Sequence, residues 1–463
     1  MTPQSKHWSD RDERVDVVVI GSGGAGLFAA IEAAEAGATV VVLEREPEVG
    51  GSTRLAGGYV ALCETDLQPG TKGELLADLM ESHHFDCDER LSQLYVDLAA
   101  DSYLRLKELG IVFAGVQFFA HMTKPWAHVL ATGSLGGGAQ IVDGLHRAAI
   151  AAGAEIRCLH RARRLIREEG RVVAVEIEHD GAMHRIHASR GVVVATGGFT
   201  RNPELVKNYG RPGTERIVPI TGSGSFGEGL IMALEHGAGT SYIGCGVAPT
   251  GPVEPTTAEG NLTCYAGGVI VNKEGRRFVD ESSSYLDISW AGLRQTDVTM
   301  VQIYDSEIQR AYRSTMLGQV ITGGATFSAD TLEQLHDDVS AACGLDAAEA
   351  LASVQRYNRA VETGVDEEFG RRHLLGESGA LVRIEHPPYI AAVTVPGTTH
   401  FNGGLRIDED MRVRDVWGAT IPGLYAAGEV TGGFHGSGYL SATFIGMALL
   451  FGRVAGRSAA AMT

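Results

Sequence analysis

One stretch near the start of the chain constrains the fold more than any other. The run Val15–Ile20 (VDVVVI), β-branched except at Asp16, is followed by the turn Gly21–Gly26 (GSGGAG), a helical pattern, and a second apolar run that ends at Glu44. Continuous β-branched runs are typical of strands buried in a parallel sheet. Glycines at the first, third and sixth turn positions permit a tight turn, a close approach to a pyrophosphate and close helix–strand packing. This order predicts a dinucleotide-binding α/β unit of the Rossmann type.

The same unit predicts where the dinucleotide binds. The N-terminus of the helix offers unpaired N–H groups to the phosphates. Glu44 follows Gly26 by 18 residues, a position that suits hydrogen bonds from a ribose. The motif alone does not distinguish NAD from FAD. The contacts predicted from this unit are Gly21, Gly23, Gly24, Ala25, Gly26 and Glu44.

Charge and apolar segments narrow the partners and the location of the protein. The net charge of −18 repels nucleic acid and anionic membranes, so neither is an expected partner. The N-terminal residues are polar and lack the apolar core of a signal peptide. The uncharged stretch Thr431–Gly452 is long enough to span a bilayer, but its glycines favour a buried turn and helix. The six cysteines have no metal-binding spacing, so we expect no metal and a cytoplasmic protein.

Further motifs follow along almost the whole chain. They are EREPEVGGST at 44–53, AGG at 56–58, VVVATGGF at 192–199, GSGSFGEG at 222–229, NKEGRRFVDE at 272–281, GGLRID at 403–408 and GLYAAGE at 423–429. In this order they resemble segments of the superfamily of soluble fumarate reductases, urocanate reductases and 3-ketosteroid dehydrogenases, most of them FAD-binding. The resemblance implies FAD, bound non-covalently, rather than NAD.

The resemblance also implies an α/β fold of two domains. A Rossmann-type FAD-binding domain would comprise residues 1–242 and 397–463, with an inserted α+β capping domain at 243–396. Prolines cluster at 249–255 and 387–396, close to both borders, as is typical of connections. A helix starting near Ala442 would direct its N-terminus at the flavin and stabilise the negative charge of its reduced form. The FAD contacts implied are Arg45, Gly51, Ser52, Thr53, Gly57, Gly58, Thr196, Gly197, Gly428, Glu429, Ala442 and Thr443.

The chain departs from fumarate reductases at the two positions that decide the substrate. By the resemblance, fumarate reductases have one arginine four residues after the glutamate that corresponds to Glu281, and a second arginine at the end of an HGxxR segment. This chain has Tyr285 at the first position and Tyr439 at the second. A guanidinium grips a carboxylate with two hydrogen bonds, whereas a tyrosine cannot neutralise one. The segment Gly438–Ser441 (GYLS) is similar to that of the 3-ketosteroid Δ4-(5α)-type dehydrogenases. These differences argue against fumarate, succinate or urocanate as the substrate.

We therefore predict an FAD-dependent dehydrogenase that desaturates a cyclic ketone, such as a 3-ketosteroid or a substituted cyclohexanone. Tyr439 would polarise the ketone, and Ser441 or Tyr285 would take part in removing the α-proton. Electrons would pass from FAD to an external acceptor, such as a quinone, a dye, O2 or a redox protein. His400 and Phe119 are predicted substrate contacts, although His400 equally suits an FAD contact and Phe119 equally suits the core. The alternatives are an ene-reductase running the same chemistry backwards and, less favoured, a reductase of a fumarate-like unsaturated acid. A third is a flavoprotein without its own catalysis, such as an electron-transfer or binding module, and the coincidence of Tyr285 and Tyr439 argues against it.

Overall fold

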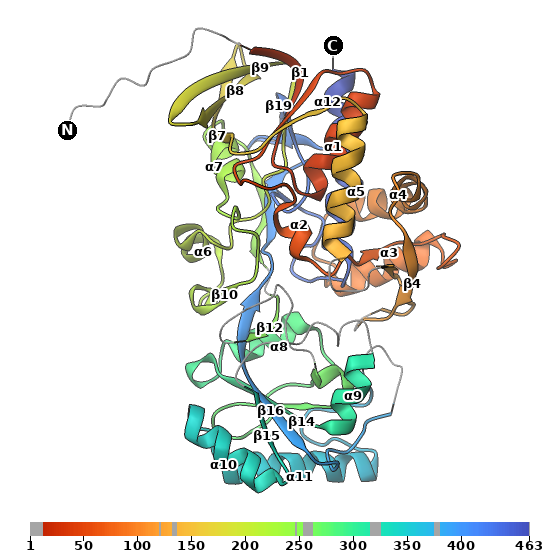
Figure 1. Cartoon of the computed structure of the whole chain (residues 1–463), viewed down its shortest axis with the longest axis vertical. Coiled ribbons are helices and arrows are strands. Elements are labelled where there is room, and N and C mark those ends of the chain that lie inside the picture. The colour runs from red at the N-terminus through yellow and green to blue at the C-terminus, as the bar shows by residue number, and fades with distance from the viewer. Residues whose placement is uncertain are drawn as a thin grey trace, which may run out of the picture.

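The chain forms two lobes, each built around its own sheet (Figure 1). The computed structural model describes residues 13–119, 122–131, 137–245, 248–252, 263–314, 326–374 and 380–462. The upper lobe of Figure 1 contains both ends of this range, and the lower lobe is inserted between them. This is the predicted architecture of a Rossmann-type α/β domain with a capping domain.

The upper lobe carries a sheet with strand order β18-β19-β9-β1-β2-β6, to which β7 and β8 add at β9. Strand β1 pairs in parallel with both β2 and β9, and β9 pairs in parallel with β19. Its elements are β1 (Glu13–Ile20), α1 (Gly24–Glu35), β2 (Val40–Leu43), α2 (Gly51–Leu55), β3 (Val60–Ala61), α3 (Lys72–Ser82), α4 (Glu89–Glu108), β4 (Phe113–Gln117), β5 (Ala127–Leu130), α5 (Gly137–Ala151), β6 (Glu155–Arg157), β7 (Arg161–Glu168), β8 (Arg171–His179), β9 (Ala182–Val194), α6 (Pro203–Tyr209), α7 (Glu228–Leu234), β11 (Thr240–Cys245), β17 (Asn402–Arg406), β18 (Arg412–Arg414), β19 (Thr420–Ala426), β20 (Thr431–Gly432) and α12 (Thr443–Ala461).

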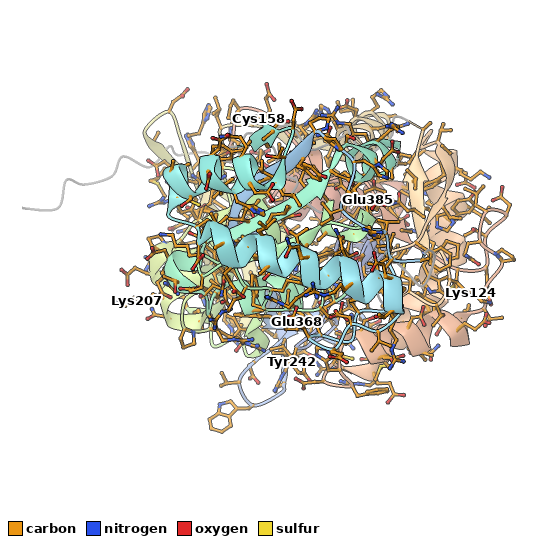
Figure 2. All side chains as sticks on the ribbon, turned by 90° about the horizontal axis from the view of Figure 1, so that it is seen from below. Lys124, Cys158, Lys207, Tyr242, Glu368 and Glu385 are labelled. Atoms are coloured by element: carbon orange, nitrogen blue, oxygen red, sulfur yellow. The ribbon has the colours of Figure 1, made fainter. Side chains whose placement is uncertain are left out.

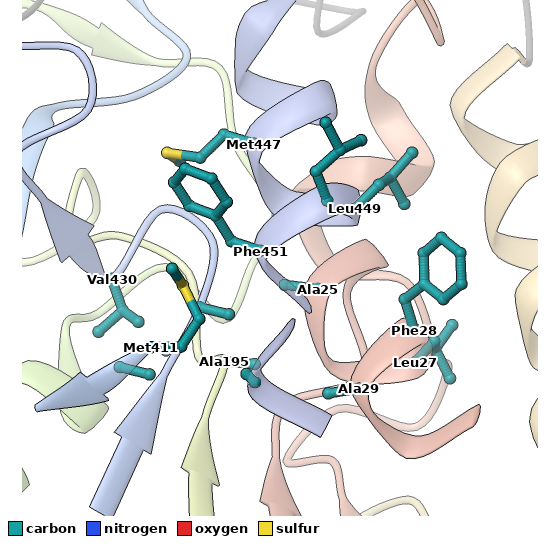
Figure 3. Packing of buried hydrophobic residues seen from close by; sticks show 14 of the residues in the cluster. Ala25, Leu27, Phe28, Ala29, Ala195, Met411, Val430, Met447, Leu449 and Phe451 are labelled. Carbon is teal, nitrogen blue, oxygen red and sulfur yellow. The ribbon is translucent and has the colours of Figure 1, made fainter. Parts of the chain in front are cut away.

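Helix α12 packs against α1, and both helices contact strands β1 and β9 of this sheet. A Cβ atom at Gly452 would lie 2.5 Å from the carbonyl oxygen of Ala25, and one at Gly456 would lie 2.2 Å from that of Ala29. The two glycines therefore permit a helix–helix approach that no larger residue allows. Figure 3 shows the apolar side chains around this contact, with Phe451 of α12 among them. Of the helices that the structure describes, α12 alone has the length and hydropathy to cross a bilayer, a property that buried core helices share.

The lower lobe is a mixed sheet with strand order β10-β16-β14-β13, and β12 and β15 also pair with β16. A second hydrophobic core lies between this sheet and two helices, α10 and α11. Figure 2 shows these two helices from below, where they cover the face of the lobe that points away from the upper lobe. The elements of the lower lobe are β10 (Val218–Pro219), β12 (Ala248–Pro252), β13 (Val269–Val271), α8 (Tyr285–Gly292), β14 (Met300–Asp305), α9 (Ser306–Ser314), β15 (Thr326–Ala329), α10 (Leu332–Cys343), α11 (Ala347–Thr363) and β16 (Tyr389–Thr398).

Strand β16 runs across the predicted border between residues 396 and 397. Its C-terminal end pairs with β10, through Val218 with Gly397 and Pro219 with Thr398. Strand β10 precedes the predicted cap in sequence, so the sheet of the lower lobe includes a short strand from outside the range 243–396. The exact division at 242/243 and 396/397 stays a prediction.

Candidate active site

A cavity of about 500 Å³ lies at the C-terminal ends of the parallel strands of the upper lobe and extends to the lower lobe at Tyr285. Ligands of open α/β sheets bind at these strand ends. The predicted cofactor contacts that line this cavity are Gly21, Gly23, Gly24, Ala25, Glu44, Arg45, Gly51, Ser52, Thr53, Gly57, Gly58, Thr196, Gly197, Gly428, Glu429 and Ala442. The predicted catalytic and substrate residues in its wall are Phe119, Tyr285, His400, Tyr439 and Ser441.

The glycine-rich turn leaves no room for side chains where it meets the sheet. Gly21 has a φ of +103°, and a Cβ atom there would lie 2.4 Å from the carbonyl oxygen of Ala195. A Cβ atom at Gly26 would lie 1.9 Å from the carbonyl oxygen of Gly21. Gly26 is therefore required for close helix–strand packing, and it lies beneath the turn rather than in the cavity wall. Helix α1 has no side-chain cap at Gly23. Its N-terminal residues Gly23, Gly24 and Ala25 line the cavity, so the helix N-terminus faces the cavity.

Glu44 is held in place at the end of β2 by its neighbours. Its carboxylate accepts hydrogen bonds from the hydroxyl and the backbone N–H of Ser22, at 2.5 and 3.1 Å, and from the backbone N–H of Glu46, at 2.9 Å. Ser22 also accepts a bond from the backbone N–H of Gly50 at 3.2 Å. Ser22 was not among the predicted contacts, although its position between two motif glycines was a signal for it.

Glu429 presents an acceptor that no described residue satisfies. Its Oε1 atom is buried and has no hydrogen-bond partner among the residues that the structure describes. Burial raises the pKa of this carboxyl group to about 7, although the backbone N–H groups of Gly198 and Phe401 act in the opposite direction. A buried polar atom without a partner is rare in a folded protein, which indicates that a ligand group satisfies it. The wall therefore suits a ligand hydroxyl at Glu429.

Tyr285, Tyr439 and Ser441 meet at one end of the cavity, although Tyr285 comes from the start of α8 and the other two precede α12. The hydroxyl of Ser441 donates to Tyr285 Oη at 3.4 Å, and the rings of the two tyrosines are 5.6 Å apart. The backbone N–H of Ala442 donates to Tyr439 Oη at 3.1 Å. Ala442 has a φ of +69° and caps α12, so the phenol oxygen lies at a helix N-terminus. The structure thus brings the three predicted catalytic residues together.

His400 is neutral and belongs to the same end of the cavity. Its ring lies 5.1 Å from that of Tyr439, and Nδ1 lies 2.9 Å from Thr399 Oγ1. Burial lowers the pKa of His400 to about 3, so it carries no charge near neutral pH. Its Nε2 atom has no hydrogen-bond partner within the described part of the chain. Phe119 also lines the cavity and packs edge-on against Tyr59, with ring centroids 5.1 Å apart.

Thr443 does not line the cavity, in contrast to its prediction as a cofactor contact. Its side chain is fully buried, and its hydroxyl donates to the carbonyl oxygen of Leu440 at 2.5 Å and lies 2.9 Å from His435 Nε2. The hydroxyl therefore bonds to the segment that precedes α12 and to His435, and not to the cavity. Other residues of α12 line the cavity instead, namely Phe444, Ile445 and Ala448.

The cations of the cavity are paired and lie near the glycine-rich turn. Among the described lining residues the guanidinium groups belong to Arg45 and Arg54. Arg45 forms ion pairs with Glu46 and Glu228, both at 3.1 Å, and Arg54 forms one with Asp143 at 2.6 Å. The rings in contact with Tyr439 are those of Tyr285, His400, His435 and Phe444, and none carries a charge at neutral pH. Within the described part of the cavity wall, the tyrosine end therefore presents no cation to a carboxylate.

Comparison with known proteins decides the family. The model of a family described as FAD binding domain matches residues 16–445. The chain belongs to this family of FAD-binding proteins. A fumarate reductase (cytochrome) of Shewanella frigidimarina is 32% identical over 460 residues, which cover 97% of this chain and 77% of that protein.

Two solved structures that resemble this FAD-binding protein are a reductase and a dehydrogenase. The open conformation of a flavocytochrome c3 fumarate reductase superposes with a TM-score of 0.82 at 28% identity, over 97% of this chain and 79% of that one. A 3-ketosteroid-Δ4-(5α)-dehydrogenase of Rhodococcus jostii superposes with a TM-score of 0.77 at 27% identity, over 98% of both chains. The chain is therefore an FAD-dependent oxidoreductase that acts on CH–CH groups, by reduction of a C=C bond or by its formation.

The residues of the cavity fit FAD. The α1 N-terminus at Gly23 and Gly24 would receive the pyrophosphate, and Glu44 and Glu429 would accept hydrogen bonds from sugar and ribityl hydroxyls. The N-terminus of α12 would lie against the flavin. FAD, when bound, supplies hydride chemistry next to the two tyrosines. These individual contacts stay predictions.

Replacing Glu429 with glutamine tests the hydroxyl contact. In the wild type we expect the affinity for FAD to rise with pH towards about 7 and then to level off, because a donated hydrogen bond favours the ionised carboxylate. Glutamine cannot ionise, so the Glu429→Gln affinity should not follow this titration and should be about 10-fold lower at alkaline pH. Titration of the apoprotein with FAD from mildly acidic to mildly alkaline pH measures both effects. Identical pH profiles in the two proteins would contradict the contact.

Proposed function

We propose that this protein uses non-covalently bound FAD to reduce a C=C bond that is conjugated to an uncharged carbonyl group, as in a cyclic enone. The observation that carries the proposal is the set of neutral groups at one end of the cavity: Tyr285, Tyr439, Ser441 and His400. Phenol and serine hydroxyls donate to a carbonyl oxygen, whereas a buried carboxylate requires a paired cation. The cations of the described cavity wall are already paired elsewhere.

Tyr439 would donate a hydrogen bond to the carbonyl oxygen of the substrate. Its phenol oxygen accepts the N–H of Ala442 at 3.1 Å, and hydrogen bonds in a chain polarise one another. The N-terminus of α12 also favours the negative charge that gathers on this side as the carbonyl becomes enolate-like. Tyr439 would thus act where charge develops during the reaction.

Tyr285 and Ser441 would handle the proton at the α-carbon. In the reduction the β-carbon gains a hydride and the α-carbon gains a proton, so a proton donor is needed beside the substrate. The hydroxyls of these two residues are 3.4 Å apart, which permits transfer of a proton between them. Which of the two contacts the α-carbon stays open. His400, neutral and with Nε2 unpaired among the described residues, would accept or donate a hydrogen bond at the edge of the ring.

We infer the direction of the reaction, reduction rather than formation of the C=C bond, from the proteins that this chain resembles. The same side chains serve reduction and dehydrogenation, because the two directions share one transition state. Similarity to fumarate reductases over 97% of this chain favours reduction over the desaturation that the sequence motifs favoured. Desaturation of a cyclic ketone is the second candidate, and the ketosteroid dehydrogenase match over 98% of both chains supports it. An external redox partner would deliver or remove electrons. A cytoplasmic location stays a prediction.

Anaerobic mixing of the chemically reduced holoenzyme with cyclohexenone, a 3-oxo-4-ene steroid or fumarate tests the proposal. We expect an enone to restore the oxidised-flavin band at least about 100-fold faster than fumarate, because a dicarboxylate entering the tyrosine site would lose its hydration without gaining a cation. Reoxidation by fumarate and by neither enone would refute the proposal. Bleaching of the oxidised holoenzyme by the saturated ketones would support the second candidate instead.

A further inference from the structure

A second cavity, of about 490 Å³, shares Tyr439 with the cavity already described. Its wall combines the C-terminal end of α3, the segment 280–287 that leads into α8, residues 370–373 and the segment Gly438–Tyr439. It therefore lies between the two lobes, and Tyr439 stands at the place where the two cavities meet. A substrate held at Tyr439 has this space directly beside it.

Ser82 offers a buried hydroxyl in the wall of the second cavity. Its side chain is more than nine-tenths buried, with 8% exposure, and Oγ has no hydrogen-bond partner within the described residues. A Cβ atom at Gly438 would lie 1.9 Å from the carbonyl oxygen of Ser82, so Ser82 is pressed against the segment that carries Tyr439. A buried hydroxyl without a partner is unfavourable, and a ligand hydrogen bond would satisfy it. Ser82 thus indicates that something polar binds here.

The remaining wall mixes acceptors with donors. Glu81, Asp280 and Asp287 supply carboxylates, and Arg372 supplies a guanidinium. Asp280 is held by the backbone N–H and the hydroxyl of Ser282, at 2.8 and 2.6 Å. A carboxylate ligand would face three like charges here. A hydroxyl both donates and accepts, so it matches both kinds of wall group.

We propose that the second cavity binds a hydroxyl-bearing substituent of the substrate, distal to the reacting carbonyl at Tyr439. Ser82 and Ser283 would hydrogen-bond this substituent, and Met122 and Leu286 would contact the carbon chain that joins it to the ring. The inference rests on the proposed function, since it assigns the part of the same substrate that lies away from the flavin. It makes the substrate a neutral, hydroxylated enone rather than a plain hydrocarbon ring or an acid.

Equilibrium binding to the oxidised holoenzyme tests this inference, because oxidised FAD cannot reduce an enone and turnover does not interfere. The probes are cyclohexenones that carry a 3-hydroxypropyl, a propyl or a 2-carboxyethyl group at C4, and the readout is the perturbation of the flavin spectrum. We expect the hydroxypropyl probe to bind about 10-fold more tightly than the propyl probe, and the carboxyethyl probe to bind more weakly than both. Equal affinities for the hydroxypropyl and propyl probes would overturn the inference.

Ser82→Ala and Ser283→Ala should each remove most of the preference for the hydroxypropyl probe, by about 5- to 10-fold, and leave the affinity for the propyl probe within about 2-fold. Ser340→Ala is the matched control, because Ser340 belongs to α10 and lines neither cavity. If both cavity variants keep the full preference, the assignment of the second cavity is wrong. Reoxidation of the reduced enzyme by the propyl probe separates the two hypotheses, since it tests the enone chemistry without the hydroxyl.

Discussion

Replacing Tyr439 with phenylalanine should lower kcat for an enone by about 10²- to 10³-fold, which is the usual effect of removing one hydrogen-bond donor to a developing oxyanion. The phenol ring should stay in place, because its contacts with Tyr285, His400 and Phe444 are aromatic packing that phenylalanine preserves. Binding of FAD should therefore be unchanged. Anaerobic reoxidation of the reduced Tyr439→Phe holoenzyme by cyclohexenone measures the rate, and its flavin absorbance measures the FAD content.

Tyr389→Phe is the control for this experiment. Tyr389 begins β16, donates its hydroxyl to the carbonyl oxygen of Glu385 at 3.2 Å and lines neither cavity. Its replacement should leave the rate within about 2-fold, since a single exposed hydrogen bond contributes little. If Tyr439→Phe also reacts at the wild-type rate with full FAD content, Tyr439 does not polarise the substrate.

Replacing Arg277 with methionine should lower the free energy of unfolding by about 3–5 kcal/mol, the effect of removing one partner from a buried ion pair. The Arg277 side chain is 1% exposed and bonds Glu281 at 2.6 Å and Asp366 at 2.9 Å. Arg371, also fully buried, is the second cation of this group and lies 3.4 Å from Glu281. Without Arg277, Glu281 would keep the guanidinium of Arg371, whereas Asp366 would keep only the backbone N–H groups of Glu368 and Arg371. Glu281 precedes Tyr285 by four residues, so the network also anchors the segment that carries Tyr285.

Urea unfolding of the holoenzyme, followed by circular dichroism, measures this loss. Arg310→Met is the matched control, because Arg310 pairs with Glu307 at 2.6 Å one helical turn away while its side chain is 69% exposed. Exposed pairs contribute less than about 1 kcal/mol, so this variant should remain close to the wild type. Equal stabilities for Arg277→Met and Arg310→Met would show that the buried network does not hold the lower lobe together.

The sequence alone determined the parts of this protein whose physics is local. The glycine-rich turn, the strand before it and Glu44 after it form one contiguous unit, and the turn geometry that glycine permits can be read from spacing. The uncharged stretch Thr431–Gly452 includes the first half of α12, and its glycines predicted a buried turn and helix, in line with the close approach of Gly452 to α1. The predicted cavity residues were found through contiguous motifs, each of which carries its own conformational signal.

Only the tertiary structure decided how distant segments meet. Tyr285 and Ser441 are 156 residues apart in sequence, and their contact depends on how the lower lobe docks on the upper one. Thr443 directly follows Ala442, which lines the cavity. The Thr443 side chain points away from the cavity and bonds to the carbonyl oxygen of Leu440, because successive residues at a helix start face different directions. Ser82 and the second cavity likewise have no sequence signal, since burial arises from segments that pack across the whole chain. Spacing reports local conformation, whereas the packing of remote surfaces decides which polar groups lose water and face each other.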